Sequence, residues 1–208
     1  MMRLGMNMFF FVFLVVSLQQ NMTIFKESDL QTDFIITNGT ILNSTTYLKA
    51  MQNQLHGHTY WSINMTTKQT DMLEYMHNVE ALALNIYHEA RGESDAGKIA
   101  VALATRNRVE DKRWPDNYFE VIWQKKQFSW TIPYEKYPLE GRQEIAIEKI
   151  KDEKAFKKCL EIAAWVARGQ GEDYTLGANH YNTKGVDPAW DDEMELTLVI
   201  GEHEFFKG

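Results

Sequence analysis

The sequence predicts an α+β domain in which a helical half precedes a small antiparallel sheet. Apolar residues recur at three- and four-residue steps from Val79 to Ala90, which is the period of a helix with one buried face. From Ala178 onward the pattern changes to short β-branched or aromatic runs, separated by turn residues and acids. Helices followed by antiparallel strands are typical of the α+β class.

Capping and terminating residues bound the expected helices. Ser94 or Asp95 is a favourable N-cap for the second helix, and Gly92 and Gly169 are favourable stops for the first and the third. The region around Pro133 and Pro138 is expected to be loop. The expected helices are 79–91, 95–108 and 152–168, and the expected strands are 178–182, 196–200 and 204–206.

The N-terminus has the geometry of an export signal. Arg3 precedes nine consecutive apolar residues, Met8 to Val16, within a mostly apolar stretch over residues 4–18. This stretch is too short for an ordinary membrane span, and we interpret residues 1–18 as a signal peptide or a signal anchor. No convincing small-x-small cleavage site follows, so both cleavage and association with the inner membrane through residues 4–18 stay open.

A polar segment separates this signal from the expected folded domain. Residues 19–72 are rich in Asn, Thr, Gln and Ser and show no sustained apolar period, so we interpret them as a tether. The folded domain is then expected over residues 73–208. The single cysteine, Cys159, excludes an intramolecular disulfide and a zinc cluster built on cysteines.

The charge pattern excludes one class of partner. The 22 Lys and Arg residues are scattered among 29 Asp and Glu residues, the formal net charge is -7, and there is no basic block. We therefore expect no nucleic-acid binding, and no feature of the sequence implies a protein partner.

The densest cluster of chemically able side chains lies at residues 87–93, where the first helix ends. Glu89 follows Ile86 by three residues and Leu82 by seven, so it lies at the margin of the apolar stripe and is expected to be partly desolvated. Desolvation raises a carboxyl pKa, which suits a general acid that protonates a glycosidic oxygen. Glu93, one turn later, would raise that pKa further when ionised. The alternative is that both are solvated surface acids paired with nearby basic residues.

Two other hydrolase classes make different demands on the sequence. A zinc protease needs the pattern H-E-x-x-H, which begins at His88 but has Gly92 where the second histidine would stand. A thiol-dependent amidase or peptidase would use Cys159 as nucleophile with His180 or His203 as base. Because Cys159 falls inside an expected helix, a buried structural thiol is the favoured interpretation.

Aromatic side chains are candidates for glycan binding. Phe128, Trp130 and Trp190 present faces that could stack on sugar rings, although core packing is at least as common a use for them. Strand alternation over residues 180–182 would place the first and third side chains on one face and Tyr181 on the other.

Three ordered blocks of the sequence resemble the SleB/CwlJ family of cell-wall hydrolases. The blocks are 83–109, 114–130 and 177–206, and they carry the motifs YHEARGE, NRV, WP, QFSW, GANHYN, PAW and IGEHEFF. Because three blocks in family-like order and spacing are more specific than one short motif, the resemblance strengthens the assignment of Glu89 as catalytic.

The resemblance implies a lysozyme-like, lytic-transglycosylase-like domain whose partner is peptidoglycan. The first Glu of the acidic signature, which matches Glu89, would protonate the oxygen between N-acetylmuramic acid and N-acetylglucosamine. In a lytic transglycosylase the same carboxyl then acts as base and a 1,6-anhydro sugar forms, so no metal or other cofactor is implied. A muramidase that uses water would need a second carboxylate, for which Glu93 is the nearest candidate. Glu93 could as easily cap the amides of residues 95–97.

The motifs also supply the expected substrate-binding residues. They are Arg91, Gln127, Phe128, Ser129, Trp130, His180, Tyr181 and Asn182. An export segment, a tether and a lone lytic domain suit a phage lysis enzyme or a host enzyme of wall remodelling, acting in the periplasm or cell wall or from the inner membrane. A non-catalytic glycan-binding protein of the wall or virion is a further alternative, against which the intact acidic signature argues.

Overall fold

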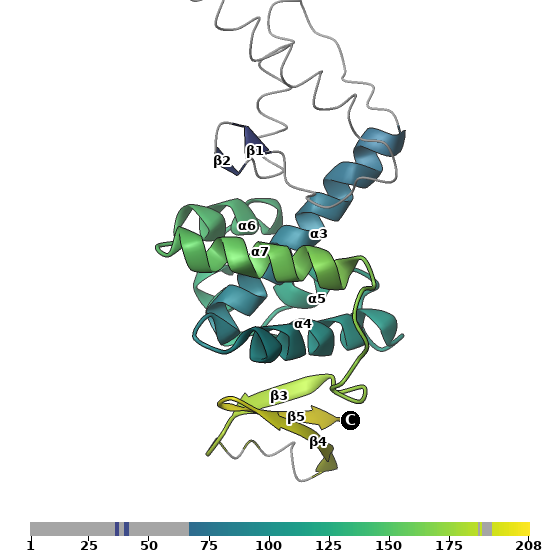
Figure 1. The fold of residues 1–208 in the computed structure, drawn as a ribbon. Coiled ribbons are helices and arrows are strands. Elements are labelled where there is room, and N and C mark those ends of the chain that lie inside the picture. Colours follow the sequence, from purple (N-terminus) through teal and green to yellow (C-terminus); the bar gives the residue numbers. More distant parts are fainter. Residues whose placement is uncertain (1–35, 38–39, 42–66, 187, 189–192) are drawn as a thin grey trace, which may run out of the picture. The chain divides into compact units, whose positions relative to one another are not determined.

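The computed structural model describes residues 36–37, 40–41, 67–186, 188 and 193–208 (Figure 1). Contacts divide the chain into two units, residues 1–41 and 42–208. In the first unit the described residues form a minimal antiparallel pair of strands, β1 (Ile36–Thr37) and β2 (Thr40–Ile41). All further elements belong to the second unit.

Three sequence predictions fall wholly or mostly outside the described residues, one of them being most of the tether over residues 19–72. The other two are the export segment over residues 1–18 and the candidate sugar-binding side chain of Trp190. Among the helices that the structure describes, none combines the length and the apolar character needed to cross a membrane.

The long helix α3 (Thr67–Ala90) is the centre of the second unit. Its apolar stripe, which includes Val79, Leu82 and Ile86, is fully buried. Each such side chain stabilises the fold by about 1.5–3 kcal/mol relative to an exposed one. The main partners of α3 are α4 (Asp95–Glu110), α5 (Tyr118–Trp123) and α7 (Glu153–Ala167). The predicted first helix is confirmed and is longer than expected, because it begins at Thr67, inside the segment predicted as a tether.

The ends of α4 and α7 lie within two residues of where the sequence predicts them. Ser94 Oγ accepts a hydrogen bond from the backbone N–H of Gly97 at 3.2 Å and so caps α4. Asp152 caps α7 in the same way, with Oδ1 accepting from the N–H of Ala155 at 2.9 Å. At the other end of α7 the chain turns at Gly169, whose φ of +71° favours glycine.

The prediction of loop around Pro133 and Pro138 is wrong. Pro133 lies inside the 3₁₀ helix η1 (Ser129–Tyr134), and Pro138 directly precedes α6 (Leu139–Glu148). Proline lacks a backbone N–H, but the first turn of a helix does not use that donor, so a proline at a helix start breaks no hydrogen bond. Pro138 thus marks where α6 begins, whereas Pro133 lies near the end of η1.

A three-stranded antiparallel sheet follows the helices, as predicted. Its order is β3-β5-β4, with β3 (His180–Thr183), β5 (His203–Lys207) and β4 (Glu195–Ile200). In Figure 1 helix α4 lies between the other helices and this sheet. The α+β prediction, a helical half plus a small antiparallel sheet, is confirmed.

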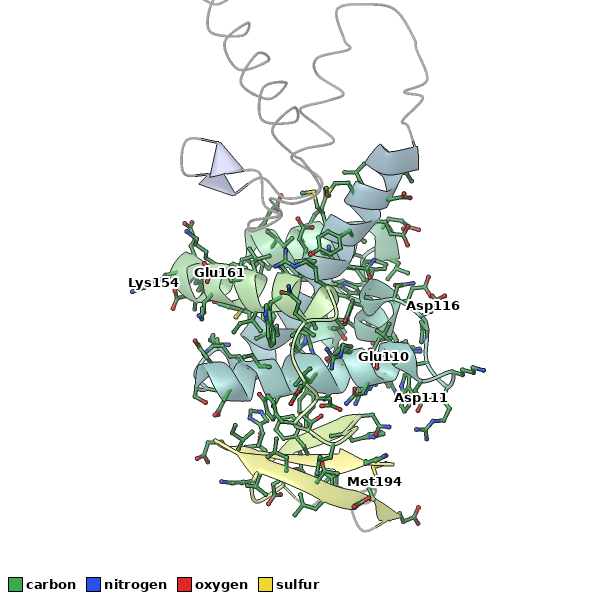
Figure 2. All side chains as sticks on the ribbon, turned by 45° about the vertical axis from the view of Figure 1, so that its right-hand side comes forward. Glu110, Asp111, Asp116, Lys154, Glu161 and Met194 are labelled. Carbon is green, nitrogen blue, oxygen red and sulfur yellow. The ribbon has the colours of Figure 1, made fainter. Side chains whose placement is uncertain are left out.

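Small residues on α4 allow the sheet to approach closely. Side chains from the two layers meet between α4 and the sheet (Figure 2). Tyr181 lies opposite Phe205 in the β3–β5 pairing. The buried cluster at this contact consists of Ala90, Ala100, Val101, Ala104, Ala178 and Phe205, with Tyr181, Leu198 and Ile200 packed against it. This packing brings β3 next to the end of α3, where Glu89 lies.

Candidate active site

Glu89 lies in the last turn of α3 and is half-buried. Burial raises the pKa of its carboxyl to about 6, and the positive charge of Arg108 opposes that rise. No described residue donates a hydrogen bond to this carboxyl. Glu89 is therefore an acid that keeps its proton at mildly acidic pH and whose oxygens are free of described protein donors.

Arg108, near the end of α4, is a fixed positive charge in the neighbourhood of Glu89. Its side chain is buried, and Nε donates to the backbone carbonyl of Asn179 at 2.5 Å. The guanidinium lies over the rings of Phe128 and Trp114, with Cζ 5.4 Å and 5.9 Å from their centroids. Burial lowers the pKa of Arg108, and Tyr181 and Glu89 partly restore it. An Arg held this way stabilises the ionised form of Glu89.

Asn85, one helical turn before Glu89, connects three other elements. Its Oδ1 accepts from the indole N–H of Trp130 at 2.9 Å. Its Nδ2 donates to Thr105 Oγ1 and to Tyr181 Oη, each at 3.3 Å. These bonds join η1, α4 and β3 to α3, and Asn85 itself is fully buried. The network fixes the side chains of three elements around Asn85, one helical turn before Glu89.

The aromatic residues of the predicted set divide into core and partly exposed positions. Phe128 is buried, stacks on Tyr181 with ring centroids 6.4 Å apart, and belongs to the packing of the site. Trp130 is half-buried, and His88 stacks on it at 4.5 Å with an interplanar angle of 11°. Burial and the charge of Arg91 lower the pKa of His88 to about 4, so this ring is neutral at neutral pH.

The strand residues alternate as the sequence predicts. Tyr181 points toward α3 and contacts Asn85. His180 instead contacts the Trp114 ring at 5.9 Å between centroids, and its Nδ1 lies 2.7 Å from Asn179 Oδ1. Asn182 is buried and donates to the carbonyl of Val186 at 3.2 Å, which secures the segment after β3.

The remaining predicted binding residues are more exposed. Arg91 is exposed, lies over the Tyr87 ring with Cζ 5.3 Å from the centroid, and donates to the Tyr87 carbonyl. Ser129 is exposed and Gln127 is half-buried at the start of η1. Arg91, Gln127 and Ser129 are therefore the predicted binding residues that face solvent. Phe128 and Asn182 are buried and support the site by packing and hydrogen bonding.

Glu93 lies against the turn between β4 and β5. Its Oε1 accepts from the backbone N–H of Glu202 at 3.4 Å and lies 3.7 Å from His203 Nδ1. The alternative that Glu93 caps the amides of residues 95–97 is wrong. Ser94 is the N-cap of α4 and accepts from Gly97, while the Glu93 carboxylate accepts from Glu202. The causes of the Glu89 pKa shift are burial and Arg108, and the charge of Glu93 is not among them.

Comparison with known proteins settles the family. The model of the Cell Wall Hydrolase family matches residues 92–206, which include Arg108 and Tyr181 and begin three residues after Glu89. The chain belongs to the cell wall hydrolase family. This confirms the family resemblance of the sequence motifs, and it makes the protein a wall-degrading enzyme whose substrate is peptidoglycan.

Two solved structures are similar to this cell wall hydrolase. One is the catalytic domain of the Bacillus cereus SleB protein, with 25% identity and a TM-score of 0.46 over 63% of this chain and 90% of that one. The other is the catalytic domain of the germination-specific lytic transglycosylase SleB from Bacillus anthracis, with 23% identity and a TM-score of 0.47 over 71% and 100%. No curated protein matches the chain.

The structure of the cell wall hydrolase argues against Cys159 as a catalytic nucleophile. Cys159 is fully buried in α7, and burial raises the pKa of its thiol to about 11. The charged neighbours that affect it are Lys98, Arg91 and Asp152, and neither His180 nor His203 is among them. In the described part of the chain no group of three or more His, Cys, Asp or Glu side chains could hold a metal ion.

Sequence reasoning missed two residues of the site, Asn85 and Arg108. Asn85 interrupts the apolar stripe of α3 with an amide, and a polar residue at such a position needs a partner. Arg108 lies near the end of the alanine-rich helix. The helix dipole favours a basic residue there in any helix, so its position in the sequence does not indicate a role in the site. The signal for Asn85 was therefore present, whereas the role of Arg108 depends on tertiary contacts.

Proposed function

We propose that this cell wall hydrolase cleaves the glycan strand between N-acetylmuramic acid and N-acetylglucosamine as a lytic transglycosylase, with Glu89 as acid and then base. The observation that carries the proposal is the half-buried Glu89 carboxyl, whose pKa burial raises to about 6. A carboxyl with this pKa is substantially protonated at mildly acidic pH and can still act as a base once ionised.

The reaction needs one proton to move in each direction. Glu89 gives its proton to the glycosidic oxygen, the bond from that oxygen to C1 of the muramic acid breaks, and the N-acetylglucosamine end leaves as an alcohol. The ionised Glu89 then takes the proton of the 6-hydroxyl as that oxygen bonds to C1, which yields a 1,6-anhydro ring. The charge of Arg108 favours Glu89 while it is ionised between the two steps.

The contacts of Glu93 favour this mechanism over hydrolysis by water. A hydrolase needs a second carboxylate beside the sugar, to position water or to form a glycosyl intermediate. The Glu93 carboxylate accepts from Glu202 and lies near His203 instead. Glu93 would be a catalytic residue only if water were the acceptor. Mass spectrometry of the released muropeptides distinguishes the two mechanisms.

Export of the enzyme is the second part of the proposal. Peptidoglycan lies outside the cytoplasmic membrane, and residues 4–18 have the composition of an export signal. We propose that residues 1–18 direct export and that the enzyme acts from the periplasm, the wall or the inner membrane. A fusion of residues 1–72 to a reporter that is active only after export tests this, and a reporter that stays inactive contradicts it.

The decisive experiment is mass spectrometry of soluble muropeptides released from purified peptidoglycan. The full chain is compared with Glu89→Gln and with Glu161→Gln, which changes an exposed carboxyl on α7 (Figure 2). We expect 1,6-anhydro products from the wild type and Glu161→Gln, and a loss of at least about 100-fold in Glu89→Gln.

Other outcomes point to other functions. Products with a reducing muramic acid would mean that water is the acceptor and would return Glu93 to the reaction. New free amino groups without glycan cleavage would mean an amidase or peptidase. Binding of peptidoglycan without any release would mean a glycan-binding protein, and full activity in Glu89→Gln would remove Glu89 from the mechanism.

A further inference from the structure

The direction of the hydrogen bonds at Asn85 is fixed by a group that can only donate. The indole N–H of Trp130 has no acceptor capacity, so the atom it contacts at 2.9 Å must be the amide oxygen of Asn85. The amide nitrogen then faces Thr105 Oγ1 and Tyr181 Oη, each at 3.3 Å. Because an amide NH₂ donates and does not accept, both hydroxyl oxygens must accept from it.

Each hydroxyl group keeps its own proton to donate elsewhere. The Thr105 hydroxyl donates to the backbone carbonyl of Val101 at 3.0 Å, so its hydrogen bonding is complete. The Tyr181 hydroxyl already accepts from Asn85, so its O–H must point away from that amide. Among the described residues, the hydrogen bond of Tyr181 Oη is the one that it accepts from Asn85, and its own O–H donates to none of them.

The Tyr181 ring is held so that this O–H lies in the neighbourhood of Glu89. Phe128 stacks on one part of the ring and Phe205 contacts another, with centroids 6.4 Å and 5.6 Å away. Asn85, which donates to Tyr181 Oη at 3.3 Å, lies one helical turn before Glu89 on α3. In keeping with this position, the charges of Glu89 and Arg108 both act on the Tyr181 phenol. Burial raises the pKa of Tyr181 well above its usual value, so the phenol stays neutral and acts as a donor rather than an acid.

We propose that Asn85 is a positioning residue that fixes Tyr181 as a hydrogen-bond donor to an oxygen of the glycan strand bound beside Glu89. The inference rests on the proposed function. Tyr181 is already an expected substrate-binding residue, and the inference adds the direction of its hydrogen bond and the residue, Asn85, that fixes this direction. The acceptor is an acetamido carbonyl or a hydroxyl oxygen of an amino sugar. Tyr181 makes and breaks no covalent bond, and its hydrogen bond orients the sugar relative to the Glu89 proton.

A double-mutant cycle on Asn85 and Tyr181 tests whether Asn85 acts on the substrate through Tyr181, an arrangement called the Asn85–Tyr181 relay below. Tyr181→Phe removes only the hydroxyl and should lower kcat/KM on glycan strands about 10-fold. Asn85→Asp still accepts from Trp130 but offers Tyr181 an acceptor oxygen, so the phenol O–H turns inward and the same loss follows. Because Asn85 acts through Tyr181, the double variant should be no less active than Tyr181→Phe alone.

Tyr174→Phe is the matched control. The Tyr174 hydroxyl donates to the backbone carbonyl of Ala96, and the side chain is exposed. We expect this variant to keep wild-type kcat/KM. If the Asn85→Asp variant does not fold, Asn85→Leu replaces it in the double-mutant cycle, because leucine is close to asparagine in shape. The melting temperature of every variant is recorded.

The outcomes separate this inference from the proposed function. Full activity in Tyr181→Phe, or losses that multiply in the double variant, would overturn the relay. If Glu89→Gln is inactive in the same assay while Tyr181→Phe is fully active, only the relay fails. If Glu89→Gln cleaves glycan at the wild-type rate, the proposed function fails, whatever the cycle shows.

Discussion

The Glu93 carboxylate occupies the space in which a side chain at position 201 would lie. A Cβ placed on Gly201 would come 1.7 Å from Oε2 of Glu93, and Gly201 has a φ of +58°. The neighbouring backbone N–H of Glu202 donates to the same carboxylate. The turn between β4 and β5 therefore meets the segment after α3 at a point where only glycine fits.

Gly201→Ala should lower the free energy of unfolding by about 2–4 kcal/mol, through the left-handed backbone and the clash with Glu93 together. Gly185→Ala is the control, because Gly185 has a φ of +80° and no atom within 4 Å of its added Cβ. Gly185→Ala should lower the free energy of unfolding by about 1–2 kcal/mol, the cost of the left-handed backbone alone. Urea unfolding of both variants measures the difference, and equal losses would show that the Glu93 contact imposes no packing constraint.

Glu93→Gln should keep glycan cleavage largely intact, unlike Glu89→Gln. A glutamine retains a carbonyl oxygen that can accept from Glu202, whereas Glu93→Ala leaves that N–H without its acceptor and should cost about 1–3 kcal/mol of stability. Initial rates of peptidoglycan release and melting temperatures check both parts. An inactive Glu93→Gln with an unchanged melting temperature would instead make Glu93 the second catalytic carboxylate.

Local signals predicted most of the fold because they lie within each element. The caps Ser94 and Asp152 and the apolar period of α3 are readable without tertiary information. Helix α6 was missed because only Gln143 and Ala146 of its residues are buried, so it shows no apolar stripe. The preceding proline reinforced the interpretation as loop.

The site was predictable only where a residue carries its own signal. Glu89 stands at the margin of an apolar stripe, and the resulting burial gives the expected rise in pKa. The hydrogen bond that positions Trp130 could not be predicted from the sequence, because its partner Asn85 lies 45 residues away in the chain. Arg108 likewise acquires its role from Phe128 and Asn179, which only the tertiary fold brings to it.

Burial of Glu89 should make the enzyme less stable above the pKa of this residue. The pKa rises from 4.5 to about 6 on folding, so the folded chain holds the proton more tightly. The resulting stabilisation is fully present below pH 4.5 and is lost as the pH rises through about 6. Glu89→Gln, which needs no proton, should therefore match the wild type at pH 4 and exceed it by about 1–2 kcal/mol at pH 7.5.

Urea unfolding at both pH values checks this difference, with Glu161→Gln as the control. The Glu161 side chain is exposed on α7 (Figure 2) and should show no pH-dependent gain. A stability difference for Glu89→Gln that does not change between pH 4 and pH 7.5 would contradict a raised pKa at this position.

The rate of glycan cleavage should fall as the pH rises above about 6, because the first step needs protonated Glu89. Arg108 lowers the Glu89 pKa, so Arg108→Met should move this limb of the kcat/KM profile to higher pH. Arg113→Met, which removes an exposed charge paired with Asp111 after the end of α4, should leave the limb in place. A limb that stays fixed in Arg108→Met would mean that another group controls it.

Cys159 should be dispensable for cleavage. Its thiol is fully buried with a pKa of about 11, so only about 1 in 10,000 molecules carries the reactive thiolate at pH 7. Iodoacetamide should therefore leave the native enzyme active, and Cys159→Ala should keep its kcat/KM while losing about 1–2 kcal/mol of stability to the cavity it creates. Release of muropeptides and the melting temperature are measured together, since loss of cleavage in a fully folded Cys159→Ala would restore the thiol amidase as the better account.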